Sequence, residues 1–440
     1  TNTVQLHQCS FVAPLFNTTK SKINTPLTFF MNNLKNIFRY IGRTSKFIDY
    51  PLLISYVILC FIGLVMVYSA SMVAATKGTL TGGVEVSGTY FYNRQLIYVI
   101  MSFIIVFFIS FMMNIKVFKQ SKVQQWIMII IFVLLFLTLL VGKNINGSKS
   151  WLDLGFMNLQ ASELLKIALI LYISYVLSKK LPQLRGNLRI IKGPIILIIL
   201  CLGLVLLQGD IGQTLLTLII ILAMFLFVGI GAKKIVKGPI LYIILGFILI
   251  AGFFIFTGMM PEYLKARFST IYDPFSSSSG TGYHLSNSLM AIGNGGLFGR
   301  GLGNGIMKLG YLPEAHTDFI FAVICEELGL VGALLVIGLL FFIVFRAFIL
   351  ATKTSSYFYK LICVGVASYI GSQTFVNLGG ISATIPLTGV PLPFISFGGS
   401  SMISLSIAMG LLLLVARQIK VEEKRAIKNQ KSKVDIPRQY

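Results

Sequence analysis

A short segment near residue 315 carries three side chains with the chemistry to act on a hydroxyl group. Glu314, His316 and Asp318 alternate along the chain where an apolar run begins. A carboxylate in such a position can serve as a general base, because it can take the proton from a hydroxyl as that oxygen attacks. The alternative is that Asp318 only complements the dipole of the following helix, with Thr317 as its cap. We predict that Asp318 is catalytic and that Glu314 and His316 bind substrate.

Cations suited to an anionic leaving group occur in the same part of the sequence. Arg267 and Lys308 precede Asp318 within what we predict to be one long loop, which also contains Tyr283. A positive charge beside a phosphate leaving group stabilises the negative charge that develops as the bond breaks. We therefore expect Arg267, Lys308 and Tyr283 to bind substrate.

Two further segments place polar groups at the ends of apolar runs. Lys149 and Trp151 precede one such run, and Ser400 lies near the end of residues 386–401, which are rich in proline and glycine. This uncharged stretch cannot form a lipid-exposed helix, so we expect irregular backbone that lines a cavity within the protein. Trp151 has the alternative role of an anchor at the membrane interface. We expect Lys149, Trp151 and Ser400 to contact substrate.

Charged residues inside apolar runs are costly unless they are paired or face a polar cavity. Glu163 and Lys166 are three residues apart in such a run, so we predict a structural ion pair within one helix. Glu326 follows Asp318 by eight residues, which is about 12 Å along a helix and too far to share one reacting bond. We expect Glu326 to bond to another helix or to line a polar cavity.

Residues 293–305 contain overlapping Gly-X-Gly spacings. Exposed backbone N–H groups in such a segment can bind an anion, but the spacing matches neither a P-loop nor a dinucleotide fingerprint. We therefore favour a flexible hinge over an anion cradle.

The elements that position these residues are apolar helices. The chain has 440 residues with 12% charged residues and a mean hydropathy of +0.84, which excludes a water-soluble globular enzyme. A hydrocarbon core about 30 Å thick requires roughly 20 apolar residues per helix. Ten stretches qualify, near residues 51–71, 95–113, 123–141, 160–178, 191–207, 212–231, 238–257, 319–345, 358–377 and 400–416. We predict an all-α polytopic membrane protein with about ten transmembrane helices, or nine if the corner at 208–211 does not separate the fifth from the sixth.

The basic residues predict the orientation of these spans. Of 37 Lys and Arg residues, 28 fall on the side of the two termini and eight in the loops of the opposite side. Because basic residues are retained in the cytoplasm, we expect cytoplasmic tails at 1–50 and 417–440 and an extracytoplasmic loop at 258–318, between the seventh and eighth helices. The same alternation accounts for the net charge of +23 without a nucleic-acid partner. We also expect that the native chain starts at Met31.

Six segments distributed over residues 50–415 are similar to motifs of the SEDS family (shape, elongation, division and sporulation), the bacterial FtsW/RodA polytopic proteins. These segments are GLVMVYSAS (63–71), NGSKSW with QASELLK (146–151 and 160–166), LLQGDIGQTLL (206–216), GYHLSNSLMAIGNGGLFGRGLGNG (282–305), YLPEAHTDFIFAVICEELGLVG (311–332) and TGVPLPFISFGGSS (388–401). The PEAHTD segment and the basic tails resemble the division branch more than the elongation branch. The chain departs from the family pattern at Gly209, His284, Asn287 and Phe397.

The resemblance implies a glycosyltransferase that polymerises lipid II into glycan strands on the outer face of the bacterial cell membrane, at the division septum. The family's catalytic aspartate corresponds to Asp318, which would deprotonate the acceptor sugar in an inverting reaction. A divalent cation, Mg²⁺ or Mn²⁺, or a cluster of Arg and Lys would offset the charge of the leaving diphosphate. The implied partners are a class B penicillin-binding protein and other membrane proteins of the division machinery.

Two other functions compete with this interpretation. A flippase for the lipid-linked precursor would use polar groups near the middle of the membrane, namely Glu163, Lys166, Asp210 and Glu326, and would need no base at the outer mouth. A non-catalytic scaffold of the division machinery would use the long loop only as a binding surface. The sequence shows no obvious inverted repeat, and its longest polar loop lies on the predicted outer side, which favours the enzyme.

Overall fold

The computed structural model of the chain describes residues 39–145, 147–155, 157–180, 192–228, 275 and 280–434. Its helices are α2 (Tyr50–Thr76), α3 (Tyr90–Phe107) with a π-helical end (Phe108–Met112), α4 (Ile115–Phe118), α5 (Ser121–Val141), α6 (Ala161–Lys180), α7 (Lys192–Leu207), α8 (Ile211–Phe227), α12 (Gly280–Asn294), a 3₁₀ turn (Met307–Leu309), α13 (Ile320–Lys353), α14 (Tyr357–Ile381) and α15 (Gly399–Val434). The prediction of a helical membrane protein is therefore confirmed.

Nine of the ten predicted spans coincide with helices of the described residues. Seven helices are long and apolar enough to cross a membrane, and α7 and α8 are apolar but shorter. The corner at Gln208, Gly209 and Asp210 separates α7 from α8, so the fifth and sixth spans are distinct, as predicted. The seventh predicted span, Met31 and Arg267 lie outside the described residues.

A small antiparallel sheet, which the sequence did not predict, interrupts the helices. Its strands are β1 (Lys143–Ile145), β2 (Ser148–Asp153) and β3 (Asn158–Gln160), in that order. Trp151 of β2 lies opposite Lys143 on one side and Gln160 on the other. The sheet leads directly into α6, so it fixes where that helix begins.

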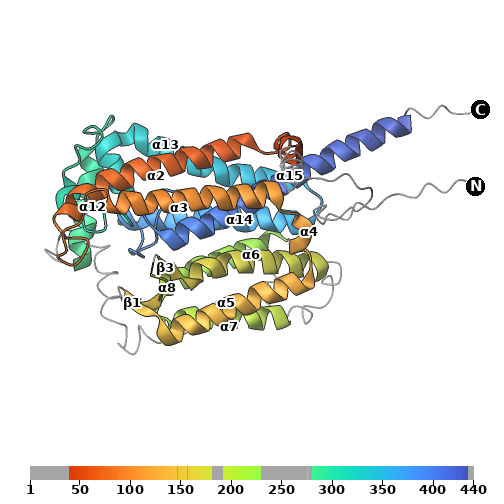
Figure 1. Cartoon of the computed structure of the whole chain (residues 1–440), viewed down its shortest axis with the longest axis horizontal. Coiled ribbons are helices and arrows are strands. Elements are labelled where there is room, and N and C mark those ends of the chain that lie inside the picture. The colour runs from red at the N-terminus through yellow and green to blue at the C-terminus, as the bar shows by residue number, and fades with distance from the viewer. Residues whose placement is uncertain are drawn as a thin grey trace, which may run out of the picture.

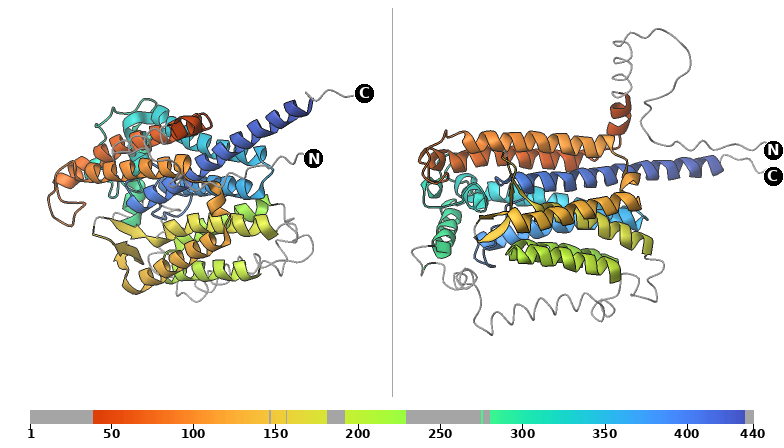
Figure 2. Two further views of the ribbon diagram at one scale, coloured as in Figure 1. Left: turned by 45° about the vertical axis from the view of Figure 1, so that its right-hand side comes forward. Right: turned by 60° about the horizontal axis from the view of Figure 1, so that its bottom comes forward.

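The long helices form one bundle, and their axes are nearly parallel (Figure 1). In that view α2 and α13 lie along one flank and α5 and α7 along the other, with α14 and α15 between them. Burial agrees with this arrangement, because 83% of the most apolar window of α15 is buried inside the protein but only 28% of that of α5. The rotated views of Figure 2 show the last turns of α15 projecting beyond the neighbouring helices.

The two ends of the bundle differ. The sheet and α12 lie at one end, which we call the loop side, and α4 and the projecting end of α15 lie at the other, which we call the tail side (Figure 1). At the tail side Arg417 of α15 donates to the carbonyl oxygens of Ser110, Phe111 and Met113 at distances of 2.6, 2.9 and 2.7 Å. These carbonyls belong to the end of a helix, where no further turn can pair them.

Glu163 is the centre of a hydrogen-bond network among four helices. Lys166 Nζ lies 2.8 Å from Glu163 Oε1, and both side chains are fully buried, so the predicted ion pair is confirmed. Gln213 of α8 donates to the same oxygen at 2.8 Å. The hydroxyls of Tyr369 in α14 and Ser404 in α15 donate to Glu163 Oε2 at 2.6 and 3.1 Å. The carboxylate thus joins α6, α8, α14 and α15.

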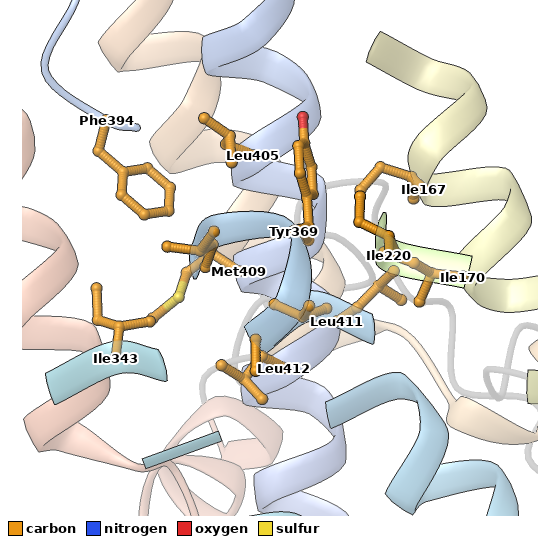
Figure 3. Close-up of a cluster of buried hydrophobic side chains, with 14 of the residues drawn as sticks. Ile167, Ile170, Ile220, Ile343, Tyr369, Phe394, Leu405, Met409, Leu411 and Leu412 are labelled. Atoms are coloured by element: carbon orange, nitrogen blue, oxygen red, sulfur yellow. The ribbon is translucent and has the colours of Figure 1, made fainter. Parts of the chain in front are cut away.

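Apolar side chains surround this network. In Figure 3 the ring of Tyr369 lies between Leu405 on one side and Ile167 on the other. All three side chains are nearly inaccessible to solvent. A charge in such surroundings is stable only when an opposite charge and hydrogen-bond donors compensate it.

Replacing one partner of the ion pair should therefore lower the free energy of unfolding more than replacing both partners. We expect Lys166→Met to lower the free energy of unfolding by about 3–5 kcal/mol, because it leaves Glu163 as an unpaired buried charge. The double variant Glu163→Gln, Lys166→Met should recover much of that loss. Unfolding by SDS titration in mixed micelles measures both values. A double variant no more stable than Lys166→Met would contradict a structural role for the pair.

Candidate functional site

The glycine-rich segment 293–305 is held against the start of α13 by backbone contacts. A Cβ atom on Gly295 would lie 1.9 Å from the carbonyl oxygen of Cys325. The backbone N–H groups of Arg300 and Gly301 donate to the carbonyls of Glu326 and Glu327 at 2.9 and 3.0 Å. The prediction of a flexible hinge is therefore wrong for Gly295 and Gly299, which pack directly on the backbone of α13 and leave no room for a side chain.

Backbone N–H groups of this loop donate hydrogen bonds to two carboxylates of the protein itself. Gly303 N donates to Glu327 Oε2 at 2.9 Å, and Ile306 N donates to Glu326 Oε1 at 2.9 Å. Glu326 and Glu327 are fully buried. Glu326 thus bonds to a loop and not to a second helix, which corrects the prediction of a bond between helices.

Lys308 completes this arrangement. Its Nζ atom lies 2.5 Å from Glu327 Oε1 and 2.7 Å from Ser69 Oγ of α2, and Ser69 also donates to Glu327. The lysine side chain is buried. The structure thus gives Lys308 a partner within the protein, and its contact with substrate stays a prediction.

The break in α13 explains how this loop reaches the helix. Gly329 has φ +65° and ψ −163°, so the helix is interrupted there. Beyond the break, the N–H groups of Leu330 and Val331 donate to the carbonyls of Gly296 and Leu297. The short part of α13 before Gly329 is almost wholly buried, and its Glu326 side chain bonds to the loop that covers it.

Asp318 lies just before α13, in contact with the irregular segment 382–398. Asn377 of α14 donates from Nδ2 to the carbonyl of Asp318 and to that of Val390, each at 2.8 Å. A Cβ atom on Gly389 would lie 3.3 Å from Asp318 Oδ2. Gly389 has φ +71°, a conformation that favours glycine. The irregular backbone predicted for this stretch is confirmed, and it determines the surroundings of the Asp318 carboxylate.

The interpretation of Asp318 as an acid of the first helical turn is not supported. The helix begins at Ile320 with Phe319 as its N-cap, and its first turn contains no acidic residue. Thr317 does not cap the helix, because its hydroxyl donates to Glu314 Oε2 at 2.7 Å. Asp318 therefore precedes the helix and is oriented by Asn377.

His316 is enclosed by aromatic rings. Its ring centroid lies 4.6 Å from that of Phe91 in α3 and 5.4 Å from that of Phe397, and its carbonyl accepts the N–H of Phe397. Removal from water lowers the pKa of His316 to about 4, and the nearby Glu314 opposes that shift. His316 is therefore neutral at pH 7 and cannot supply a positive charge to a phosphate.

Side chains of α12 extend the site. Tyr283 is half-buried, and its ring lies 6.2 Å from that of His284, which is 6.3 Å from the ring of Phe319. The structure thus gathers Glu314, His316 and Tyr283 around the start of α13, while Arg267 lies outside the described residues.

Lys149, Trp151 and Ser400 belong to a second group at the sheet. Lys149 is exposed, and its Nζ donates to the carbonyl of Leu140 at 2.9 Å. Trp151 is half-buried in β2. Ser400 accepts the N–H of Gln160 at 2.9 Å, which ties the start of α15 to β3.

The irregular segment connects the two groups. Thr388 lies against Gly212 at the start of α8, and its neighbour Gly389 lies against Asp318. Asp210, which caps α8 by accepting the N–H of Gln213, also accepts from the side chain of Gln160. The polar corner of α8 therefore lies beside the segment that contacts the candidate base.

Sequence reasoning missed several residues of the site. Asn377 and Gly389 orient Asp318, and the rings of Phe91 and Phe397 enclose His316. An Asn-Leu-Gly-Gly run at 377–380 was the only signal for Asn377, and it does not reveal that the side chain crosses to another segment. Among the described residues, no group of three His, Cys, Asp or Glu side chains is arranged to hold a metal ion.

Comparison with known proteins gives consistent results. The family of cell cycle proteins FtsW, RodA and SpoVE matches residues 50–421. The protein named "probable peptidoglycan glycosyltransferase FtsW" of Bacillus subtilis (strain 168) is 38% identical over 385 residues, covering 87% of this chain and 94% of its own. The protein of the same name from Aliivibrio salmonicida is 37% identical over 362 residues, covering 82% and 86%.

Solved structures of similar fold agree. A chain in a structure described as "structural coordination of polymerization and crosslinking by a peptidoglycan synthase complex" is 25% identical with a TM-score of 0.66, covering 84% of this chain and 98% of its own. The crystal structure of the rod shape determining protein RodA of Thermus thermophilus is 26% identical with a TM-score of 0.60, covering 84% and 97%.

The low pKa of His316 predicts a pH dependence of stability. The unfolded chain takes up a proton near pH 6.5, but the folded chain does so only near pH 4. The contribution of His316 is therefore fully present above pH 6.5 and falls as the pH drops toward 4, by at most about 1.4 kcal/mol per pH unit. We expect His316→Gln to reduce this slope, as measured by thermal unfolding in detergent between pH 7 and 4.5. The half-buried His284 is the matched control, and an equal effect of His284→Gln would contradict the assignment.

Proposed function

The chain belongs to the cell cycle protein family of FtsW, RodA and SpoVE, and from that premise we propose that it is a peptidoglycan glycosyltransferase that polymerises lipid II into glycan strands for septal wall synthesis. The two relatives are named as probable peptidoglycan glycosyltransferases, and their similarity to this chain covers 87% and 82% of it, which supports the proposal. The observation that carries the proposal is the placement of Asp318 at the loop side, where Asn377 holds its backbone carbonyl and its carboxylate lies against Gly389.

The reaction that suits this geometry is an inverting transfer with Asp318 as general base. The carboxylate takes the proton from the 4-hydroxyl of the acceptor sugar as that oxygen forms a bond to the anomeric carbon of the donor. The bond from that carbon to the diphosphate breaks, and undecaprenyl diphosphate leaves. Asn377 contributes by orientation, because it holds the backbone on both sides of the carboxylate.

The charge of the leaving diphosphate needs a partner. Lys308 is already paired with Glu327, and His316 is neutral. Arg267, predicted from the sequence, stays our candidate for this role. A Mg²⁺ or Mn²⁺ ion would supply the same stabilisation, but the described residues form no ligand cluster for one, so we assign no step to it.

The orientation of the chain fits this proposal. The sequence assigns 28 of the 37 basic residues to the side of the two termini, so we place the tail side in the cytoplasm and the loop side outward. Lipid II polymerises outside the cytoplasm, which is where Asp318 would then lie. A class B penicillin-binding protein is the partner we propose, since a similar chain is part of a peptidoglycan synthase complex. Other membrane proteins of the division machinery at the septum are the further partners that we propose.

The flippase interpretation finds less support. Glu163 and Lys166 neutralise each other and are fully enclosed. Asp210 caps α8, and Glu326 is bound by backbone N–H groups of a loop. Each polar group that such a transporter would use thus has a structural partner. A non-catalytic scaffold would not need the carboxylate of Asp318. The variant Asp318→Asn therefore distinguishes a scaffold from an enzyme.

We expect Asp318→Asn to reduce polymerisation by about 10²–10⁴-fold, because the amide cannot accept the proton. The measurement is glycan polymer formed from labelled lipid II by the chain reconstituted with its cognate penicillin-binding protein. Glu85→Gln is the matched control, since this exposed carboxylate lies in the loop between α2 and α3 and is not among the residues assigned to the site. Unchanged polymerisation by Asp318→Asn would exclude the general base, and transport without polymer from the parent chain would favour the flippase.

Gly389→Ala should move the Asp318 carboxylate without changing its chemistry. The new methyl group would lie 3.3 Å from Oδ2, and a displacement of a few tenths of an ångström should lower the rate about tenfold. Gly82→Ala is the control, because Gly82 has a similar φ of +69° and no atom within 4 Å of the added Cβ. Equal activities in the same polymerisation assay would show that Gly389 does not position the base.

A further inference from the structure

A cavity opens on the tail side, at the opposite end of the bundle from Asp318. Its volume is about 380 Å³, within the range of small-molecule pockets (~300–1,000 Å³). It lies where the loop before α5, the end of α6 and the start of α14 meet. Its lining includes two lysines and three serines, Lys119, Lys179, Ser178, Ser355 and Ser356, beside the aromatic residues Tyr175, Tyr357 and Phe358. Two cations and three hydroxyls around one cavity are suited to an oxyanion.

The two cations of this cavity are held by aromatic rings and a phenol. Lys119 Nζ lies 4.2 Å from the ring centroid of Tyr359 and 5.5 Å from that of Phe358. Lys179 Nζ lies 4.6 Å above the ring of Tyr175 and donates to its hydroxyl at 2.7 Å. These contacts fix the ammonium groups but do not neutralise them.

No carboxylate within the described part of the chain makes an ion pair with either lysine. The acid whose charge acts on Lys119 is Glu422 of α15, and Lys116 opposes it. Lys119 is half-buried, so its ammonium group has lost part of its hydration, and this burial lowers its pKa. A partly dehydrated cation beside a second cation is a place where an anion is favoured.

The start of α14 adds donors to the same cavity. Ser356 is the N-cap residue, its side chain makes no capping bond, and the first turn has no acidic residue. The first N–H groups of a helix have no partners within the helix, and they carry partial positive charge. They therefore reinforce the field of Lys119 and Lys179.

The surroundings of the cavity place it at the level of lipid headgroups. Helix α5 begins two residues after Lys119 and exposes Trp126, Ile129 and Ile130, which are 64%, 51% and 53% accessible. An exposed tryptophan one turn into an apolar helix is typical of the membrane interface, and apolar side chains beyond it face acyl chains. The excess of basic residues on this side assigns it to the cytoplasmic leaflet.

We propose that this cavity binds the phosphate group of an anionic phospholipid of the inner leaflet, with Lys119 and Lys179 as ligands. The hydroxyls of Ser355 and Ser356 donate to the same phosphate oxygens. This site is separate from the proposed catalytic centre and does not depend on it. Basic cavities between helices on the cytoplasmic side are suited to acidic headgroups.

The test is a calorimetric titration of the purified full chain in detergent at low salt. The probes are dioctanoyl phosphatidylglycerol, dioctanoyl phosphatidylcholine and inorganic phosphate. We expect phosphatidylglycerol to bind, and Lys119→Gln with Lys179→Gln to weaken it by about fivefold per lysine. Lys119→Arg with Lys179→Arg should retain binding, which separates loss of charge from loss of fold.

A second double variant, Arg425→Gln with Lys428→Gln, controls for the general effect of losing two positive charges. It removes two exposed basic residues of α15 on the same side of the bundle. These substitutions should change the affinity less than twofold. An equal loss in both double variants would overturn the cavity as the site. Equal binding of phosphatidylcholine would overturn recognition of an anionic lipid, and equal binding of inorganic phosphate would assign the cavity to a soluble phosphate instead.

Discussion

Three amide side chains satisfy the backbone carbonyls of the irregular segment 382–398, and the site depends on these bonds. Gln95 of α3 donates to Ser396, while Gln373 and Asn377 of α14 donate to Pro391 and Val390. Within a membrane a carbonyl without a partner costs several kcal/mol, so irregular backbone persists only where the protein supplies donors. The amides therefore permit a glycine to approach Asp318 where a regular helix would present side chains.

In the glycine-rich loop 293–305 the roles of donor and acceptor are exchanged, because the backbone supplies donors and side chains supply acceptors. Here two buried carboxylates, Glu326 and Glu327, accept from backbone N–H groups of the loop, and Lys308 balances one of them. Glycines allow the loop backbone to come this close. The first turns of α13 and the residue before them thus meet two non-helical segments, segment 382–398 at Asp318 and the glycine-rich loop at Glu326 and Glu327.

Hydropathy and local spacing predicted the helical framework well because both are properties of neighbouring residues. The spans follow from apolar composition, and the Glu163 and Lys166 pair follows from a separation of three on one helix. The Asp318 assignment combined its place at the end of a polar loop with a resemblance to a family.

Contacts between distant parts of the chain could not be predicted in this way. The glycine-rich segment looked flexible because its partner, the break at Gly329, is recognisable only from backbone angles. Lys308 looked available because Glu327 and Ser69 approach it from other elements. The sheet was missed since three short strands leave little pattern in the sequence.

The bonds of Arg417 have a consequence for the opposite end of its helix. The Arg417 guanidinium donates hydrogen bonds to three carbonyl oxygens at the π-helical end of α3. A shift of α15 by one residue along its axis would therefore break all three bonds together. A helix transmits such a constraint along its length, at 1.5 Å per residue. Arg417 therefore fixes the position of α15 along its axis at the tail side, and with it the position of Ser400 and Ser401, about 25 Å away at the loop side.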